Sequence, residues 1–107
     1  MKFVVEKIRV LFPDVERSAE HYTTHRIKRG DKYVGKITRT RKPGKSEYFN
    51  IRFCVYKKHK DPTDKIPWTW IEMTPNFATA YDTAMYINDP DTWPIIKDWK
   101  LFEYDKN

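Results

Sequence analysis

The sequence predicts an α+β fold: an antiparallel β-meander of about four to five strands, with a short N-terminal helix and one packed C-terminal helix. Only two leucines stand beside many β-branched residues and four Trp, seven Tyr and six Phe, a composition that favours sheet over a helix bundle. Two connections in the middle of the chain have the glycine-containing chemistry of hairpin turns. At 107 residues the chain has the size of one domain, so we expect residues 1–107 to form a single domain.

The alternation of apolar and polar residues and the position of one proline predict the first strand and the first helix. Residues 2–12 alternate apolar and polar side chains, which predicts a strand that ends at Pro13, although the same residues also fit an apolar helical stripe. Pro13 suits the first position of a helix, and two acidic residues follow it in the first turn. We therefore expect a short helix over 13–22.

Three strands of period two follow, over 24–29, 32–41 and 47–58, and the third has the clearest pattern. Its two faces differ in chemistry. The predicted core face carries Phe49, Ile51, Phe53 and Val55, and the other face carries Tyr48, Asn50, Arg52, Cys54 and Tyr56.

The last elements are a strand, a helix and a tail. Residues 66–73 predict a short strand, which Pro67 restricts to an edge of the sheet. Thr74 is a good N-cap and Pro75 a good first residue, which predicts a helix through Ile87. The tail, 93–104, predicts a helical turn and leaves room for a final strand.

The positive charge is concentrated in one segment. Between Arg26 and Lys60 there are thirteen Lys and Arg against two acidic residues, a balance of +11, whereas the rest of the chain has a balance of −5. Like charge gathered on one segment destabilises a fold unless it is well solvated or meets an anionic partner.

Few residues carry catalytic or metal chemistry. His21 and His25 have a spacing that suits one metal ion on a helix, with Glu20 as the only further ligand; two partly exposed histidines at an element junction are the simpler interpretation. Cys54, beside cations, is a candidate for a lowered thiol pKa, or else a structural cysteine. The three glycines form no phosphate-binding loop. We therefore expect a protein that is not an enzyme and holds no cofactor or metal.

The chemistry of the second sheet face favours nucleic-acid binding. Trp68 and Trp70 share a parity opposite to Ile71, and neighbouring strands place cations beside them. Cations neutralise phosphates and aromatic planes stack on bases. The residues 39–45 would form a basic hairpin tip. The candidate binding residues are Arg26, Lys28, Lys36, Arg39, Arg41, Lys42, Lys45, Arg52, Tyr56 and Trp68.

Two other interpretations remain open at this point. Helices that cover the second face would make Trp68 and Trp70 core residues and leave the lysines as edge protection. The compact, aromatic, lysine-rich sequence also resembles small phage accessory or inhibitor proteins, which implies a basic face that binds an acidic surface of a host protein.

Two short motifs carry a further resemblance. The basic hairpin with Tyr33-Val34-Gly35-Lys36-Ile37 and the helical Ala80-Tyr81-Asp82-Thr83-Ala84 resemble the DNA-binding domain of the APETALA type of plant regulators and the arm-binding domain of phage integrases. The resemblance covers roughly half of the chain. It implies a three-stranded sheet that enters the major groove, and no site residue is carried over from it.

The location is predicted from what the chain lacks. No apolar run approaches the ~20 residues of a membrane span, and the first residues are charged too soon for a secretory leader. The single cysteine fits a reducing compartment. We expect no membrane partner and a cytoplasmic or nucleoid-associated protein.

Overall fold

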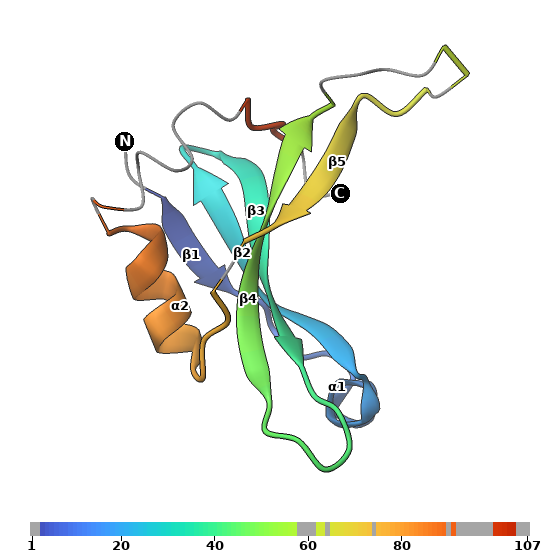
Figure 1. Cartoon of the computed structure of the whole chain (residues 1–107), viewed down its shortest axis with the longest axis vertical. Helices are drawn as coiled ribbons and strands as arrows, with labels where there is room; N and C mark the ends of the chain where they lie inside the picture. The colour runs from blue at the N-terminus through green and yellow to red at the C-terminus, as the bar shows by residue number, and fades with distance from the viewer. Residues whose placement is uncertain are drawn as a thin grey trace.

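The computed structural model describes residues 3–57, 62–63, 65–73, 75–89, 91 and 100–104. One antiparallel sheet holds five strands in the order of the sequence (Figure 1): β1 (Val4–Lys7), β2 (His21–Arg29), β3 (Lys32–Thr40), β4 (Tyr48–Tyr56) and β5 (Trp68–Glu72). The described residues also form two helices, α1 (Pro13–Ser18) and α2 (Ala80–Ile87). The predicted α+β class with an antiparallel meander is confirmed.

The boundaries of the first strand and of both helices differ from the prediction. The first strand ends at Lys7, and β2 begins at His21, which leaves room for only six residues in α1. The second helix begins at Ala80, where Thr79 is the N-cap and its side chain accepts a hydrogen bond from the backbone N–H of Asp82.

The later start of α2 has a tertiary cause. Phe77 exchanges two backbone hydrogen bonds with Phe49 of β4, at 2.7 and 2.8 Å. This bridge holds the chain extended just before the helix, so Pro75 lies in a connection and not in the first turn. Thr74, the predicted N-cap, lies outside the described residues.

Strand β4 has hydrogen-bonded neighbours on both sides along its length. Its first part pairs with β3, as far as Phe53 opposite Gly35, and bridges to Phe77 on the other side. Its last part pairs with β5 and bridges through Val55 to Leu101. β4 is therefore a central strand, which explains why its sequence has the strongest alternation.

The residues 100–104, which we call the inserted segment, fill a gap in the sheet. The regular pairing of β3 with β4 stops at Gly35, and beyond it the segment lies between the two strands (red in Figure 1). The N–H of Phe102 donates to the carbonyl of Cys54 at 2.8 Å, and the N–H of Tyr104 donates to the carbonyl of Tyr33 at 2.9 Å. The predicted final strand thus takes the form of two bridges; the helical turn predicted before it lies outside the described residues.

Gly35 permits a close approach of strands at the place where the gap begins. A Cβ atom there would lie 2.8 Å from the carbonyl oxygen of Arg52 and 3.0 Å from the ring of Phe53. A backbone atom cannot move aside as a flexible side chain can, so a larger residue would push β3 away from β4.

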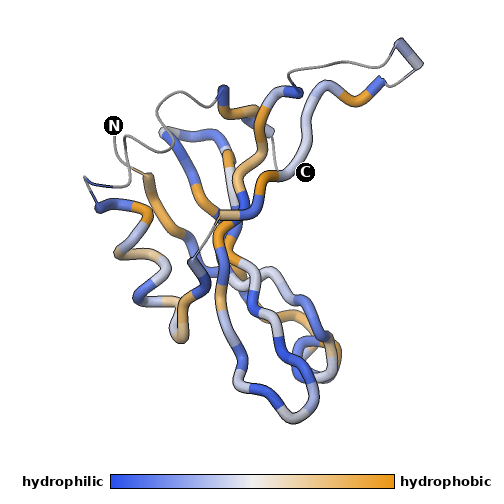
Figure 2. The backbone as a smooth tube through the Cα atoms, in the orientation of Figure 1, coloured by the Kyte–Doolittle hydropathy of each residue, from blue (hydrophilic) through white to orange (hydrophobic). Residues whose placement is uncertain are grey.

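The core lies on one face of the sheet, with α2 beside it. Across the strands the register aligns Val5, Ile27, Gly35, Phe53 and Ile71, and Ile87 of α2 belongs to the same apolar cluster. The apolar residues of α2 and β4 are orange in Figure 2, whereas the connection between β3 and β4 is hydrophilic. Among the described residues, no helix is long and apolar enough to cross a lipid bilayer.

Candidate functional site

Three cations occupy adjacent positions on the second face of the sheet, the face opposite the core. The register places one row of charged residues across all five strands: Glu6, Arg26, Lys36, Arg52 and Glu72. The acidic residues stand on the two edge strands, and the three middle strands carry the cations, which we call the cation row. Neighbouring strands are only about 4.8 Å apart, and like charges directly opposite each other destabilise a sheet.

The acidic residues neutralise the cation row only in part. Arg52 Nη2 lies 3.8 Å from a carboxylate oxygen of Glu72, and its buried Nε has no hydrogen-bond partner among the described residues. On the other side, Glu6 approaches Lys28 at 3.8 Å. Burial, together with the nearby Arg52, lowers the pKa of Lys36. The described acidic residues therefore leave the centre of the row without a carboxylate of its own.

Six aromatic rings form a continuous chain on the same face, which we call the aromatic chain. Successive ring centroids are 5.2 to 6.1 Å apart. Offset and edge-to-face contacts between aromatic rings stabilise a fold in addition to the free energy gained from the area they bury. In order, the rings are those of Tyr33, Tyr104, Trp70, Trp68, Phe102 and Tyr56.

The two ends of the aromatic chain differ in what lies over the rings. The Lys36 ammonium lies 4.3 Å from the centre of the Trp70 ring, and Lys28 lies 5.5 Å from that of Tyr33. Over the rings of Tyr56, Trp68 and Phe102, by contrast, none of the described Lys or Arg residues lies. In the described part of the chain, one end of the face is therefore cationic, and the other end consists of rings with no Lys or Arg over them, which we call bare.

The structure brings together six of the ten residues predicted from the sequence. These six, on the second face, are Arg26, Lys28, Lys36, Arg52, Tyr56 and Trp68. Lys42 and Lys45 are exposed in the β3–β4 connection, at the opposite end of β4 from Tyr56. Arg41, in the same connection, is engaged by Glu47 at 3.2 Å and by the carbonyl of Arg17. The hairpin tip is thus separate from the aromatic chain.

The position predicted for Arg39 on an exposed hairpin tip is wrong. Its side chain is only 6% exposed and forms an ion pair with Glu16 of α1, with Glu47 at 3.8 Å and the Tyr22 ring beneath it. The register places Arg39 opposite Phe49, on the parity of the core face. Arg39 therefore holds α1 to the sheet and is not available to a ligand.

Three members of the aromatic chain, Tyr33, Phe102 and Tyr104, were missed by the sequence analysis. Phe102 and Tyr104 come from the inserted segment. Their alternation with Leu101, which is buried, was the only signal for them. Alternation predicts a strand but does not say between which two strands it lies.

The structure separates the two histidines and buries the cysteine. A bulge at Thr24 puts His21 and His25 on opposite faces of β2, where they pair with Thr40 and Ile37. In the described part of the chain no three metal-ligating side chains cluster. Burial raises the pKa of the Cys54 thiol to about 11, opposite to the lowering considered from its neighbours. The thiol is therefore protonated at neutral pH.

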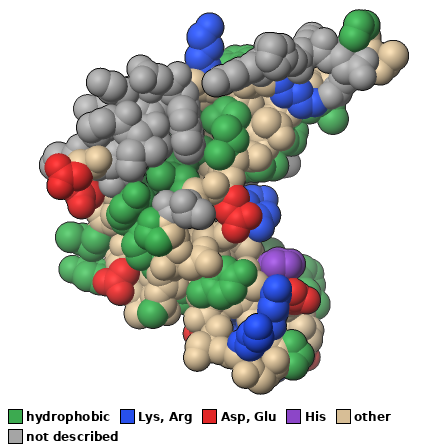
Figure 3. Space-filling view, in the orientation of Figure 1, with side chains coloured by type: hydrophobic (Ala, Val, Ile, Leu, Met, Phe, Trp, Pro, Cys, Tyr) green, Lys and Arg blue, Asp and Glu red, His purple; other side chains and the backbone are tan. Residues whose placement is uncertain are grey.

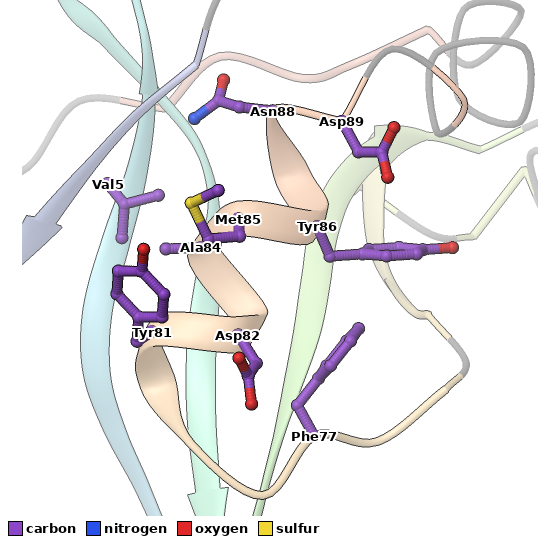
Figure 4. Close-up of a pocket in the computed structure, with 9 residues that line it drawn as sticks. All are labelled: Val5, Phe77, Tyr81, Asp82, Ala84, Met85, Tyr86, Asn88 and Asp89. Atoms are coloured by element: carbon purple, nitrogen blue, oxygen red, sulfur yellow. The ribbon is translucent and has the colours of Figure 1, made fainter.

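A groove of about 600 Å³ lies around α2, on the other side of the sheet (Figure 4). Tyr81 and Met85 are exposed one helical turn apart, near Val5 of β1. Two acidic residues, Asp82 and Asp89, rim the groove, and α2 contains no basic residue. Hydrophobic and acidic side chains accordingly lie next to each other on the α2 side in Figure 3. This surface is unsuited to an anionic ligand.

Alkaline pH should destabilise the fold through Tyr104. Its hydroxyl donates to the carbonyl of Gly35 at 3.1 Å, and burial raises the pKa of the phenol to about 12. Since the folded pKa lies above the ordinary value of 10.0, this contribution to stability is complete below pH 10 and is lost as the pH rises toward 12. In thermal melts from pH 8 upward, the melting temperature of the native protein should fall more steeply with pH than that of Tyr104→Phe. Equal slopes would contradict the prediction.

Comparison with known proteins yields no relative, since no family model, no curated protein and no solved structure matches the chain. The function is therefore inferred from the geometry and charge of the site alone.

Proposed function

We propose that the protein binds nucleic acid on the second face of its sheet and catalyses no reaction there. The observation that carries the proposal is the cation row lying beside the aromatic chain. Three adjacent cations cost stability unless an anion meets them, and a phosphate backbone supplies anions at regular spacing.

The aromatic chain favours nucleic acid over a simple anion. A phosphate or an acidic peptide would need only the cations, whereas rings that remain partly exposed on the same face offer planes for bases. The hydroxyl of the exposed Tyr56 adds a hydrogen-bonding group beside those planes. The whole face therefore matches a ligand that carries both phosphate and aromatic groups.

Removing one charge from the cation row should weaken binding and flatten its salt dependence. With four phosphates neutralised by Arg26, Lys28, Lys36 and Arg52, the log-log salt slope on a single strand should be about −3 by counterion release. Lys36→Gln should reduce this slope by about 0.7. Fluorescence anisotropy with labelled single- and double-stranded oligonucleotides, at about 50 and about 200 mM salt, measures both slopes.

Lys7→Gln is the matched control for this experiment. Lys7 is exposed on β1 opposite His25, on the other parity of the sheet, so the same charge change there should leave the slope unchanged. Equal effects of the two variants would indicate a general charge effect and contradict the proposed interface. A stoichiometric protein partner that survives nuclease treatment, together with no oligonucleotide binding, would favour an acidic protein surface as the ligand.

A further inference from the structure

We infer that the ligand is single-stranded and that its bases stack on one part of the second face, the bare rings of Tyr56, Trp68 and Phe102. We call these three rings the stacking platform. The inference rests on the proposed function and adds to it the strandedness of the ligand and a division of the face into two parts. Phosphates bind at the cation row, and bases bind beyond it.

The geometry of the platform suits a flat ligand. The rings of Trp68 and Phe102 stack on each other, inclined by only 30° with centroids 6.0 Å apart, so their planes have similar directions and a base can extend the stack. Tyr56 supports Phe102 edge-on at 5.2 Å and is itself 48% exposed. A base placed on this surface gains ring contact without first displacing a cation.

The cationic end of the aromatic chain cannot serve the same purpose. The faces of Trp70 and Tyr33 are already occupied by the Lys36 ammonium and by Arg26 and Lys28. There the rings support the cations, which keeps the charges at the surface of the face. The rings at this end therefore orient phosphate-binding groups, and only the far end is free for stacking.

The two parts lie within reach of one short strand. Arg52 and Tyr56 are four residues apart on the same face of β4, a distance of about 13 Å along the strand. Tyr56 lies opposite Trp68, and only the pair of Cys54 with Trp70 separates this position from Arg52 on the same face. A strand that runs along β4 would cross both parts in succession.

A duplex would leave the platform unused. Paired bases are stacked on one another and present only their edges and their backbone, so an aromatic plane can stack on a base only when the base is unpaired. A duplex ligand would account for the cation row but not for three bare rings beside it.

The test compares three labelled probes of about 12 nucleotides: a thymidine strand, its duplex with adenosine, and an abasic strand with the same phosphates. The thymidine strand should bind at least tenfold more tightly than either of the others. Trp68→Leu and Tyr56→Leu should each weaken thymidine-strand binding by about 5- to 150-fold and leave duplex binding unchanged. Their melting temperatures, measured in parallel, identify any variant that fails to fold.

Tyr81→Leu is the matched aromatic control, because Tyr81 is 71% exposed on α2, on the other side of the sheet. It should bind all three probes as the native protein does. Of the three rings of the stacking platform, that of Tyr56 is the most exposed to solvent, so Tyr56→Leu should disturb folding least.

The possible failures are distinguishable. If all three probes bind equally and Lys36→Gln weakens all of them, the cation row binds backbone alone: the stacking inference is overturned and the proposed function stands. If none of the probes binds to the folded protein, the proposed function is overturned, and the inference with it. Tighter binding of the duplex than of the thymidine strand would also overturn the inference.

Discussion

Phe53→Ala is expected to leave much of the protein unfolded under native conditions. Phe53 is 1% exposed, packs on the ring of Phe3 at 5.5 Å, and stands in the centre of the core-face row. Truncating a buried phenylalanine costs about 3–5 kcal/mol, since transfer free energy is lost and a cavity remains. For a domain with about 5–15 kcal/mol of total stability, that is a large fraction of the whole.

Thermal and urea unfolding followed by circular dichroism measure this effect. Phe12→Ala is the matched control, because Phe12 is 68% exposed before α1 and should lose little stability when truncated. A Phe53→Ala protein that melts within a few degrees of the native one would show that the assignment of the core face is wrong.

Glu16→Ala should be the second most damaging change, at about 3 kcal/mol. The variant leaves the Arg39 guanidinium buried over the Tyr22 ring, and among the described carboxylates only that of Glu47, at 3.8 Å, remains to offset its charge. Removing one partner of a buried pair costs more than the pair contributes, because the remaining charge stays away from water. The loss should appear as detachment of α1 and a lower melting temperature.

Asp14→Ala provides the control within the same helix. Asp14 pairs with Arg17, and both side chains are largely exposed, so their ion pair is worth about 0–1 kcal/mol. Urea titration of both variants compares the two ion pairs directly. Similar losses would mean that α1 is held by something other than the Arg39 pair. If Glu16→Gln has nearly the stability of the native protein, the loss in Glu16→Ala comes from hydrogen bonding rather than from charge.

Local patterns were sufficient to predict the sheet and one of its faces. Alternation along β4 separated Phe53 from Arg52 correctly, and the parity of Trp68 put it on the same face as Tyr56. These predictions depend only on the two-residue period of a strand and on turn residues, which act within a few positions of each other.

The features that could not be predicted from the sequence depend on contacts between residues far apart in the chain. Thr74 and Thr79 are comparable N-caps by local rules, and the bridge from Phe77 to Phe49 settles where α2 begins. Arg39 looks like a solvent-exposed cation until α1, far away in the sequence, brings Glu16 to it. The ring of Phe102 reaches the candidate site through pairing with Cys54, for which no periodicity gives a signal.

The inserted segment also has a consequence for the order of folding. Its bridge joins Tyr33 to Tyr104, which are 71 positions apart in the sequence, whereas the connections between consecutive strands of the meander are 2 to 13 residues long. Long loops carry the greater entropic cost and are closed after local contacts have formed. The side chains of the segment should therefore make their native contacts only after the folding transition state. Truncating Leu101 should then accelerate unfolding and leave the folding rate unchanged. Two of the six rings of the aromatic chain, those of Phe102 and Tyr104, would then be added only in the last step, and the rate at which the segment detaches sets how long the completed face persists.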